Sequence, residues 1–160
     1  MAENVQIAAP AARLVPPAGD NSAGEELRVL SRQECVRLLG CHQLGRLAWA
    51  VGRQAKIFPI NYLFDGTSIV VRTGPGFMFS EAPMRDVAFE IDAAADDGAW
   101  GWSVVVEGTC LNITGALDGV SERAQKLPVH AWAPGVRAKW LRIDARHISG
   151  RGFGDVPHDQ

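Results

Sequence analysis

The sequence has no long apolar run and no excess of positive charge. No stretch approaches the roughly 18–20 consecutive apolar residues that a membrane-spanning helix requires. The 160 residues carry 16 lysines and arginines against 18 aspartates and glutamates, which gives a net charge of −2. Domains that bind nucleic acid usually carry a basic excess, because they neutralise phosphates. The sequence therefore predicts no membrane partner and no nucleic-acid partner.

Cysteine is scarce, and its spacing argues against a disulfide framework or a zinc site. Cys35, Cys41 and Cys110 are an odd number of thiols without a CxxC pair, which is typical of reduced cysteines in the cytoplasm. His42 follows Cys41, but no second pair of metal-ligating residues matches it. The first residues include Glu3 and lack the basic start and apolar stretch of a signal peptide. We therefore expect a cytoplasmic protein without a metal centre.

Several common catalytic and nucleotide-binding motifs are also missing. The sequence contains no GxSxG nucleophile elbow, no GxGxxG of a Rossmann domain and no GxxxxGK[ST] phosphate loop. The acidic residues Asp92, Asp96 and Asp97 stand in the segment DAAADDG. That composition is typical of a solvated hairpin loop rather than of an acid–base cluster. These patterns assign no catalytic residue.

Composition divides the chain into one domain and two tails. Residues 1–26 are rich in alanine, proline and small polar residues without a period, so they bury too little apolar surface to offset the entropy of ordering. We expect a disordered tail there, a single domain over residues 27–153 and a flexible tail over residues 154–160. A domain of this length can form a core without disulfide bonds or a metal.

The pattern of the domain indicates mainly β structure with short helices. Ser31 and Glu34 have the spacing of a helix-capping box, and Gly40 marks the end of that helix. Asp65 and Gly66 predict a tight hairpin. The expected strands cover residues 44–51, 56–64, 68–73, 87–92 and 102–112, with a last strand or bent strand pair over 140–150, and short helical pieces cover 77–82 and 122–127. Because closure removes exposed strand edges, the pattern predicts an antiparallel β-barrel.

Two further features point to a ligand site. Arg72 and Thr73 end a predicted strand and precede Gly74-Pro75-Gly76 and a short helical segment. A guanidinium, a hydroxyl and free backbone N–H groups together favour an anion such as phosphate, although an ordinary strand-to-turn junction has the same composition. Trp100 and Trp102 bracket a glycine at the start of another strand. This arrangement predicts the rim of a ligand pocket or of a subunit interface.

Six segments occur in an order that resembles a known family. They are GRLAWAV, FPINYLFDG, SIVVRTGPG, VAFEID, GWSVVVEG and WLRIDARHISGR, and the similarity extends from about Leu30 to Phe153. In this order they resemble the pyridoxamine 5'-phosphate oxidase-like flavin-binding split β-barrel proteins, and in particular a small branch of that family. The resemblance implies an antiparallel split β-barrel of the FMN-binding type.

The resemblance also implies where a cofactor binds. Members of the family form homodimers with two flavin mononucleotide (FMN) sites at the subunit interface, each built from both chains. The corresponding residues here are Pro59, Ile60, Asn61 and Tyr62 along the isoalloxazine ring, Arg72 and Thr73 at the ribityl phosphate, Trp102 and Ser103 from the partner strand near the ring, and Arg142 near the cofactor or substrate. The Asn61 amide is expected to contact the polar edge of the ring.

The sequence departs from the family pattern at the phosphate. Relatives often carry a lysine or arginine in the segment after the glycines, where it pairs with the phosphate. This sequence has Phe77 and Met78 there, so the resemblance leaves Arg72 as the obvious charge partner and places apolar residues beside the phosphate. The Arg-rich substrate segment of true pyridoxamine phosphate oxidases is replaced by WSVVVEG, so vitamin B6 oxidation is not assigned.

The resemblance leads to one function and two alternatives. The first expectation is a flavin-dependent oxidoreductase that transfers hydride to an unidentified small molecule, with Tyr62 as the first candidate for an acid or base. The second is a reductase that uses the deazaflavin coenzyme. Its long anionic tail would use basic residues near the C-terminus, namely Arg137, Lys139, Arg142, Arg146 and Arg151. The third is a barrel without enzymatic activity that carries a flavin or tetrapyrrole, or that has lost its cofactor.

Overall fold

The structure is a computed structural model that describes residues 26–132 and 134–156. The elements in chain order are β1 (Arg28–Val29), α1 (Arg32–Cys41), β2 (Leu44–Val51), β3 (Gln54–Phe64), β4 (Ser68–Thr73), α2 (Phe77–Glu81), β5 (Asp86–Ala94), β6 (Gly101–Asn112), α3 (Gly119–Ala124) and β7 (Lys139–Phe153). The tails expected over residues 1–26 and 154–160 lie mostly outside the described residues, so both remain predictions.

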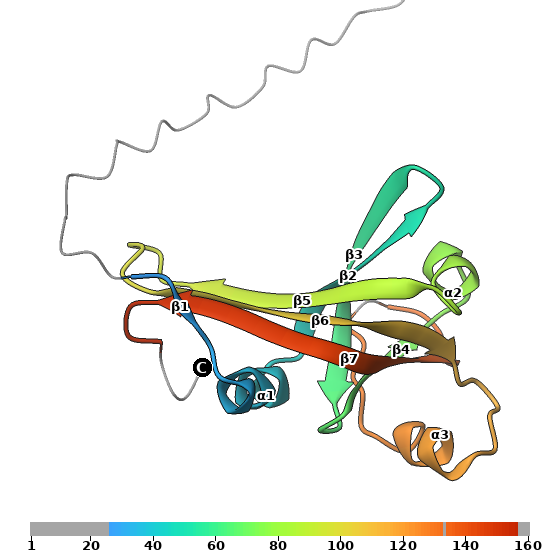
Figure 1. Cartoon of the computed structure of the whole chain (residues 1–160). Helices are drawn as coiled ribbons and strands as arrows, with labels where there is room; N and C mark the ends of the chain where they lie inside the picture. The colour runs from blue at the N-terminus through green and yellow to red at the C-terminus, as the bar shows by residue number, and fades with distance from the viewer. Residues whose placement is uncertain (1–25, 133, 157–160) are drawn as a thin grey trace, which may run out of the picture.

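The strands close into an antiparallel barrel. Six of the described strands follow one another in the order β7-β4-β3-β2-β5-β6, and β6 pairs again with β7 to complete the ring. The short strand β1 adds to the end of β7. All of these pairs are antiparallel. The mainly β barrel expected from the sequence is therefore confirmed (Figure 1).

The last strand, β7, holds the barrel together because it pairs with β4, β6 and β1. Its pairing with β6 shifts register at Glu107 and Gly108, where Glu107 faces His147 and Gly108 faces Ala145. One extra residue, Arg146, is accommodated there as a β-bulge. The bulge explains why the sequence pattern left open a single strand or a bent pair over 140–150: the structure has one strand that bends.

Helix α1 begins at the predicted capping box. The Ser31 hydroxyl accepts a hydrogen bond from the Glu34 backbone N–H at 3.2 Å, and the Glu34 carboxylate accepts one from the Ser31 N–H at 2.7 Å. These bonds from Ser31, with that from Arg28, lower the pKa of Glu34 to about 2. The helix extends one residue past Gly40 and packs its buried face against β7, β3 and β6.

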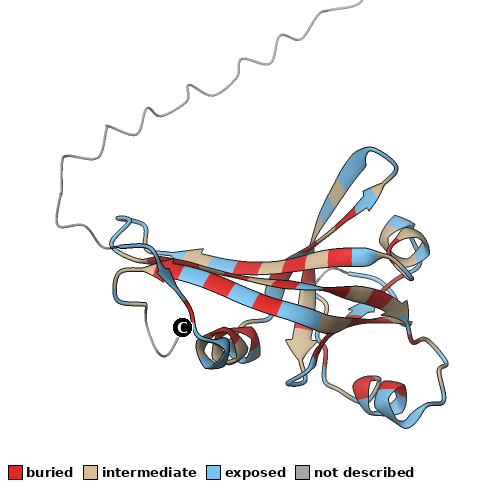
Figure 2. Cartoon of the chain, viewed as in Figure 1, coloured by how far each residue is buried: buried red, intermediate tan, exposed pale blue. Residues whose placement is uncertain are grey.

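The core fills the inside of the barrel. Alternate residues of the long strands point inward, which Figure 2 shows as red bands between tan or pale blue ones along β5 and β7. The large side chains with the least exposure include Leu47, Phe89, Ile91, Val104, Val106, Leu141 and Ile143. A second, smaller cluster joins α3 to β4 and consists of Val70, Ile113, Ala124 and Val129.

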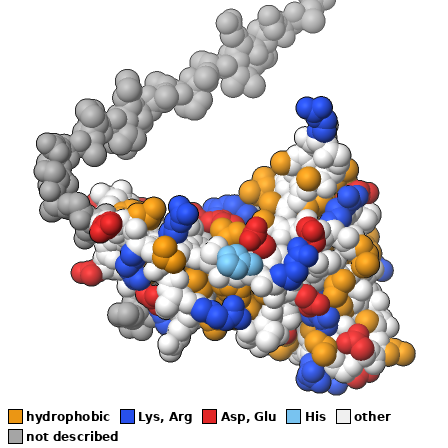
Figure 3. Space-filling model, in the orientation of Figure 1, with side chains coloured by type: hydrophobic (Ala, Val, Ile, Leu, Met, Phe, Trp, Pro, Cys, Tyr) orange, Lys and Arg blue, Asp and Glu red, His pale blue; other side chains and the backbone are white. Residues whose placement is uncertain are grey.

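The hairpin of β2 and β3 projects from the barrel (Figure 1). Its turn is tighter than expected, since β3 already begins at Gln54. The hairpin carries an exposed apolar residue, Ile57, and Figure 3 shows apolar side chains over this arm. On the same face, basic and acidic side chains are interspersed, consistent with the small net charge.

None of the helices in the described part of the chain is long and apolar enough to cross a membrane.

Candidate functional site

A cavity of about 130 Å³ gathers six of the residues that the resemblance implied. It lies between β3, β4, α2 and the loop that precedes β7. The lining residues are Phe58, Pro59, Ile60, Asn61, Arg72, Thr73, Met78, Ala131 and Arg137. Ligand pockets usually measure about 300–1,000 Å³, so this cavity, called here the anion cavity, accommodates only part of a cofactor-sized molecule.

Arg72 stands at the rim of the anion cavity in a fixed position. Its Nε donates a hydrogen bond of 2.6 Å to the backbone carbonyl of Arg137. Its guanidinium lies over the ring of Trp140, 5.4 Å from the ring centre, on the neighbouring strand β7. Thr73 follows in the strand and is buried. The terminal nitrogens of Arg72 thus remain available to a ligand while the side chain is held from two sides.

Arg137 brings a second guanidinium to the same cavity. Its Nη2 donates to the Pro134 carbonyl at 2.9 Å. A Cβ atom built on Gly74 would lie 3.2 Å from its Nη1, which places that nitrogen directly beside the backbone of the glycine segment. Its Nε is buried and has no hydrogen-bond partner among the described residues. Neither Arg72 nor Arg137 forms a salt bridge within residues 26–132 and 134–156.

Asn61, on β3, forms hydrogen bonds that connect the loop of Ala131 and Trp132 to the barrel. Its Nδ2 donates to the Gln43 carbonyl at 3.2 Å, and its Oδ1 accepts the Trp132 backbone N–H at 2.8 Å. The amide therefore connects the start of β2 with the segment that carries Ala131. Its expected contact with the polar edge of a flavin ring remains a prediction, and such a contact would replace or share one of these bonds.

Tyr62 lies on the opposite side of β3, inside the barrel. It is 2% exposed, its hydroxyl donates to the Leu39 carbonyl at 2.9 Å, and its ring meets the edge of Phe89. Burial raises the pKa of Tyr62 above its usual range. The hydroxyl thus keeps its proton near neutral pH and does not line the anion cavity.

The two residues that replace the family's basic segment have different environments. Met78 lines the anion cavity. Phe77 is half exposed and stacks against Trp49, whose ring also stacks on Phe58. The aromatic group of Trp49, Phe58 and Phe77 therefore forms the wall beside the cavity. The Trp49 side chain is 4% exposed, yet its Nε1 has no partner among the described residues.

Trp102, Ser103 and Arg142 lie away from the anion cavity of the same chain. Trp102 and Ser103 line a different surface cavity of about 400 Å³, together with Arg151. Arg142 is 9% exposed and its guanidinium is engaged by the Asp144 carboxylate and the Ser121 hydroxyl. The roles that the resemblance gave to these residues remain predictions, and for Trp102 and Ser103 they require a second chain.

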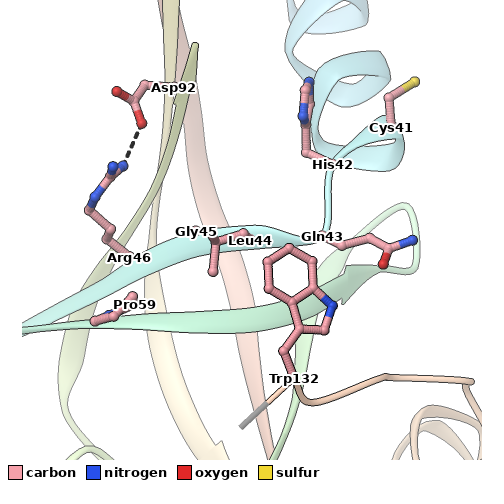
Figure 4. Close-up of a pocket in the computed structure, with 9 residues that line it drawn as sticks. All are labelled: Cys41, His42, Gln43, Leu44, Gly45, Arg46, Pro59, Asp92 and Trp132. Carbon is pink, nitrogen blue, oxygen red and sulfur yellow. Dashed lines mark hydrogen bonds and ion pairs between the residues drawn. The ribbon is translucent and has the colours of Figure 1, made fainter. Parts of the chain in front are cut away.

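A larger cavity of about 370 Å³ adjoins the anion cavity across Pro59. Figure 4 shows Trp132 reaching across to Leu44 and Gly45 of β2, with Cys41 and His42 at the end of α1 above. Trp132 is 65% exposed. On the far side Arg46 is ion-paired with Asp92 and also with Glu90. The arrangement offers an aromatic surface next to polar groups.

A further cavity of about 390 Å³ continues the anion cavity on its other side. The two share Arg72, Ala131 and Arg137, so both arginines stand at the junction. His130, Gly135 and Val136 line the far part. The two cavities therefore meet at Arg72 and Arg137.

The five basic residues considered for a deazaflavin tail do not gather at one place. Arg146 pairs with Asp86, Arg142 with Asp144, and Arg151 lines the cavity of Trp102. Lys139 lies over the ring of Phe79. Of the five, Arg137 lines the anion cavity as the structure describes it.

The described residues also hold no group of three or more His, Cys, Asp or Glu side chains that suits a metal ion.

A closed antiparallel barrel of this topology, with two arginines and an apolar strand around one cavity, defines a split-barrel protein. A sequence model of the pyridoxamine 5'-phosphate oxidase family matches residues 31–152. The chain belongs to this family, as its six sequence segments indicated. No curated protein matches the chain.

Solved structures of similar proteins agree with this assignment. A FAD-binding protein from Mycobacterium smegmatis is 30% identical, with a TM-score of 0.66 over 79% of this chain and 97% of that one. A FAD-binding protein from Mesorhizobium loti is 26% identical, with a TM-score of 0.61 and coverage of 79% and 97%. A FAD- and heme-binding protein from Mycobacterium smegmatis, 17% identical with a TM-score of 0.56 and coverage of 82% and 75%, shares the fold.

Proposed function

We propose that this protein binds a flavin nucleotide at the anion cavity and acts as a flavin-dependent oxidoreductase on a small molecule. The observation that carries the proposal is the pair of arginines, Arg72 and Arg137, that have no carboxylate partner among the described residues and lie next to the apolar segment 58–60. Two solved relatives are named for FAD binding. When bound, the flavin supplies hydride transfer, and the protein supplies position and electrostatics.

The residues of the cavity suit the chemistry of a flavin nucleotide. Its phosphate carries between one and two negative charges near neutral pH, which matches Arg72 and the Thr73 hydroxyl. An isoalloxazine ring is apolar on its faces, which matches Pro59, Ile60 and the aromatic wall behind them. Arg137 also lines the cavity, and no carboxylate among the described residues pairs with its charge.

The resemblance implied FMN, whereas the shape of the site favours the dinucleotide FAD. FMN would place its single phosphate in the anion cavity and leave the adjoining cavity of about 390 Å³ without a ligand group. FAD continues from the flavin phosphate through a second phosphate into an adenosine, and the adjoining cavity begins where Arg72 and Arg137 stand. The names of the two relatives also support FAD. Both cofactors share the flavin phosphate end.

We include a homodimer in this proposal. The anion cavity is too small for a whole flavin, and Trp132 leaves a large aromatic surface exposed beside it. Leu44 and Ile57 are exposed on β2 and β3 nearby. A second chain would cover these residues and bring Trp102 and Ser103 to the ring, as the family resemblance implies. Light scattering tests this directly: a mass of two chains supports it, and a concentration-independent mass of 17.2 kDa contradicts it.

Within this proposal the residues of the chain bind and orient the flavin, and they do not transfer protons. Arg72 positions the phosphate, Asn61 holds the loop, and Trp132 shields the side of the cavity that faces Gly45 from water. Substrate would enter the cavity of about 370 Å³ beside Pro59, next to the ring. Tyr62 takes no part in proton transfer, because its hydroxyl is buried and bonded to Leu39.

Titration with riboflavin, FMN and FAD tests the proposal. Flavin fluorescence or calorimetry should show that FMN and FAD bind at least tenfold more tightly than riboflavin, which lacks the phosphate. Equal affinity for all three would contradict a phosphate site at Arg72. No binding of any flavin would contradict the flavin function itself.

A further inference from the structure

This chain lacks the basic residue that relatives carry after the glycines at positions 74 and 76. Met78 occupies the corresponding position and lines the anion cavity without a charge. Arg72 alone would face the FMN phosphate, which carries between one and two negative charges near neutral pH, or the two singly charged phosphates of FAD. Phosphate sites in proteins commonly use more than one cationic or N–H donor. A second cation is therefore expected from elsewhere in the chain.

The geometry points to Arg137 as this second cation, an assignment that rests on the proposed flavin function. Arg137 comes from the loop before β7, whereas the family pattern takes its cation from the segment of Met78. Arg137 lines both the anion cavity and the adjoining one. It therefore contacts the first phosphate of a flavin nucleotide, and a second phosphate if the ligand has one.

Arg137 is already held in the geometry that such a role requires. Its carbonyl accepts the bond from Arg72 and its Nη2 donates to Pro134, so both ends of the residue are fixed. Long cationic side chains lose conformational entropy when they bind, and a side chain that is already ordered loses less. No carboxylate in the described chain forms a salt bridge with Arg137, so its positive charge remains available to a phosphate.

Gly74 supports the same assignment. A Cβ on this residue would lie 3.1 Å from the Val136 carbonyl and 3.2 Å from Arg137 Nη1. Both distances are tighter than ordinary contacts, so a side chain at position 74 would displace the Arg137 loop. Glycine at this position thus allows the guanidinium to approach the backbone of the glycine segment.

The test compares FMN and riboflavin on four forms of the full-length protein. These are the wild type, Arg137→Ala, Arg53→Ala and the double variant Arg137→Ala with Met78→Lys. Arg53 lies in the exposed turn between β2 and β3 and serves as the matched control, since its loss changes the net charge equally. Riboflavin reports on the ring site without the phosphate.

We expect Arg137→Ala to weaken FMN binding by roughly 10- to 150-fold, the range for one charge-assisted hydrogen bond. Riboflavin binding should change by less than about threefold, and Arg53→Ala should leave both ligands unaffected. Met78→Lys should restore most of the lost FMN affinity in the double variant, because both side chains line one cavity. Rescue by a lysine on a different element is a result that a merely structural role of Arg137 does not predict.

Other outcomes overturn the assignment. If Arg137→Ala leaves FMN affinity unchanged while the wild type prefers FMN to riboflavin, the phosphate site exists but does not use Arg137. If FMN and riboflavin weaken equally and the lysine gives no rescue, Arg137 supports the loop only. If the wild type binds no flavin, the proposed function fails first. Should Arg137→Ala fold poorly by thermal melting, Gly74→Ala keeps every charge and is expected to lower FMN affinity, and no loss there also overturns the assignment.

Discussion

The Nε of Arg72 donates a 2.6 Å hydrogen bond to the backbone carbonyl of Arg137. This bond joins the end of β4 to the loop that precedes β7, and it brings together two cations that are far apart in sequence. The bond uses the Nε of Arg72, and no hydrogen bond of its two terminal nitrogens is found among the described residues. Arg72 therefore has two separable roles, one as a charge and one as a support for the loop.

Substitution of Arg72 separates these two roles. Arg72→Ala removes both and should weaken FMN binding by roughly 10- to 150-fold, the equivalent of about 1.5–3 kcal/mol for a charge-assisted hydrogen bond. Arg72→Lys keeps the charge but loses the bond to Arg137 and the contact with Trp140, so its affinity should lie between those of the wild type and the alanine variant. Calorimetry measures both. Equal affinities of wild type and Arg72→Ala would contradict the site.

Met78→Lys in the otherwise unchanged protein should add a third cation to the anion cavity. We expect tighter FMN binding with a steeper dependence on salt, because ions screen charge–charge attraction. Riboflavin should bind as before. Titrations at low and high salt test this, and the prediction fails if the substitution weakens FMN binding or leaves its salt dependence unchanged.

Asn61→Ala should release the loop that carries Ala131 and Trp132. The substitution removes the bonds to Gln43 and Trp132, and each lost hydrogen bond lowers the free energy of unfolding by about 0.5–1.5 kcal/mol. Asn61→Asp keeps an acceptor for the Trp132 N–H and should restore part of the stability. Denaturant unfolding measures the difference. If the two variants are equally stable, the bond to Trp132 contributes nothing to stability.

Tyr62→Phe should destabilise the protein by about 1 kcal/mol without affecting flavin binding, because the Leu39 carbonyl loses its partner inside the core. Burial raises the pKa of Tyr62. The neutral hydroxyl thus stabilises the fold fully at pH values below the pKa of about 10 that tyrosine has in the unfolded chain. This stability is lost as the pH rises toward the higher pKa of Tyr62 in the folded protein. The phenylalanine variant should lack that alkaline loss.

Tyr62 is the single tyrosine of the chain, so the absorbance of tyrosinate reports on it alone. A titration with an ordinary midpoint near 10 in the folded protein would contradict its buried, bonded position. A loss of turnover in Tyr62→Phe at unchanged stability would restore Tyr62 as a candidate acid or base.

Much of the fold could be predicted from the sequence because its signals are local. The capping box of Ser31 and Glu34, the hairpin at Asp65 and the alternation in β5 each depend on neighbouring residues. The strand β1 was missed because its two residues, Arg28 and Val29, are exposed and show no periodic pattern. Helix α3 begins earlier than expected because Asp118 caps it through the Ser121 N–H.

The site was predictable only in the part that comes from adjacent strands. Pro59, Asn61, Arg72 and Met78 lie on β3, β4 and α2, which follow one another in the chain, and their motifs resemble those of the family. Arg137 belongs to a loop without a motif, 65 residues after Arg72. From the sequence alone, Arg137 is one of several basic residues near the C-terminus. It differs from Arg142 and Arg146 because those two form ion pairs, which only the tertiary structure shows.

The most direct test of the account identifies what the protein selects from a mixture. The purified protein is incubated with equal amounts of riboflavin, FMN, FAD and the deazaflavin coenzyme, desalted and denatured, and the released compound is separated by chromatography. We predict that the released compound is a flavin nucleotide, at one per chain, with riboflavin absent. Release of the deazaflavin, or of no chromophore at all, would contradict a flavin site built on Arg72 and Arg137.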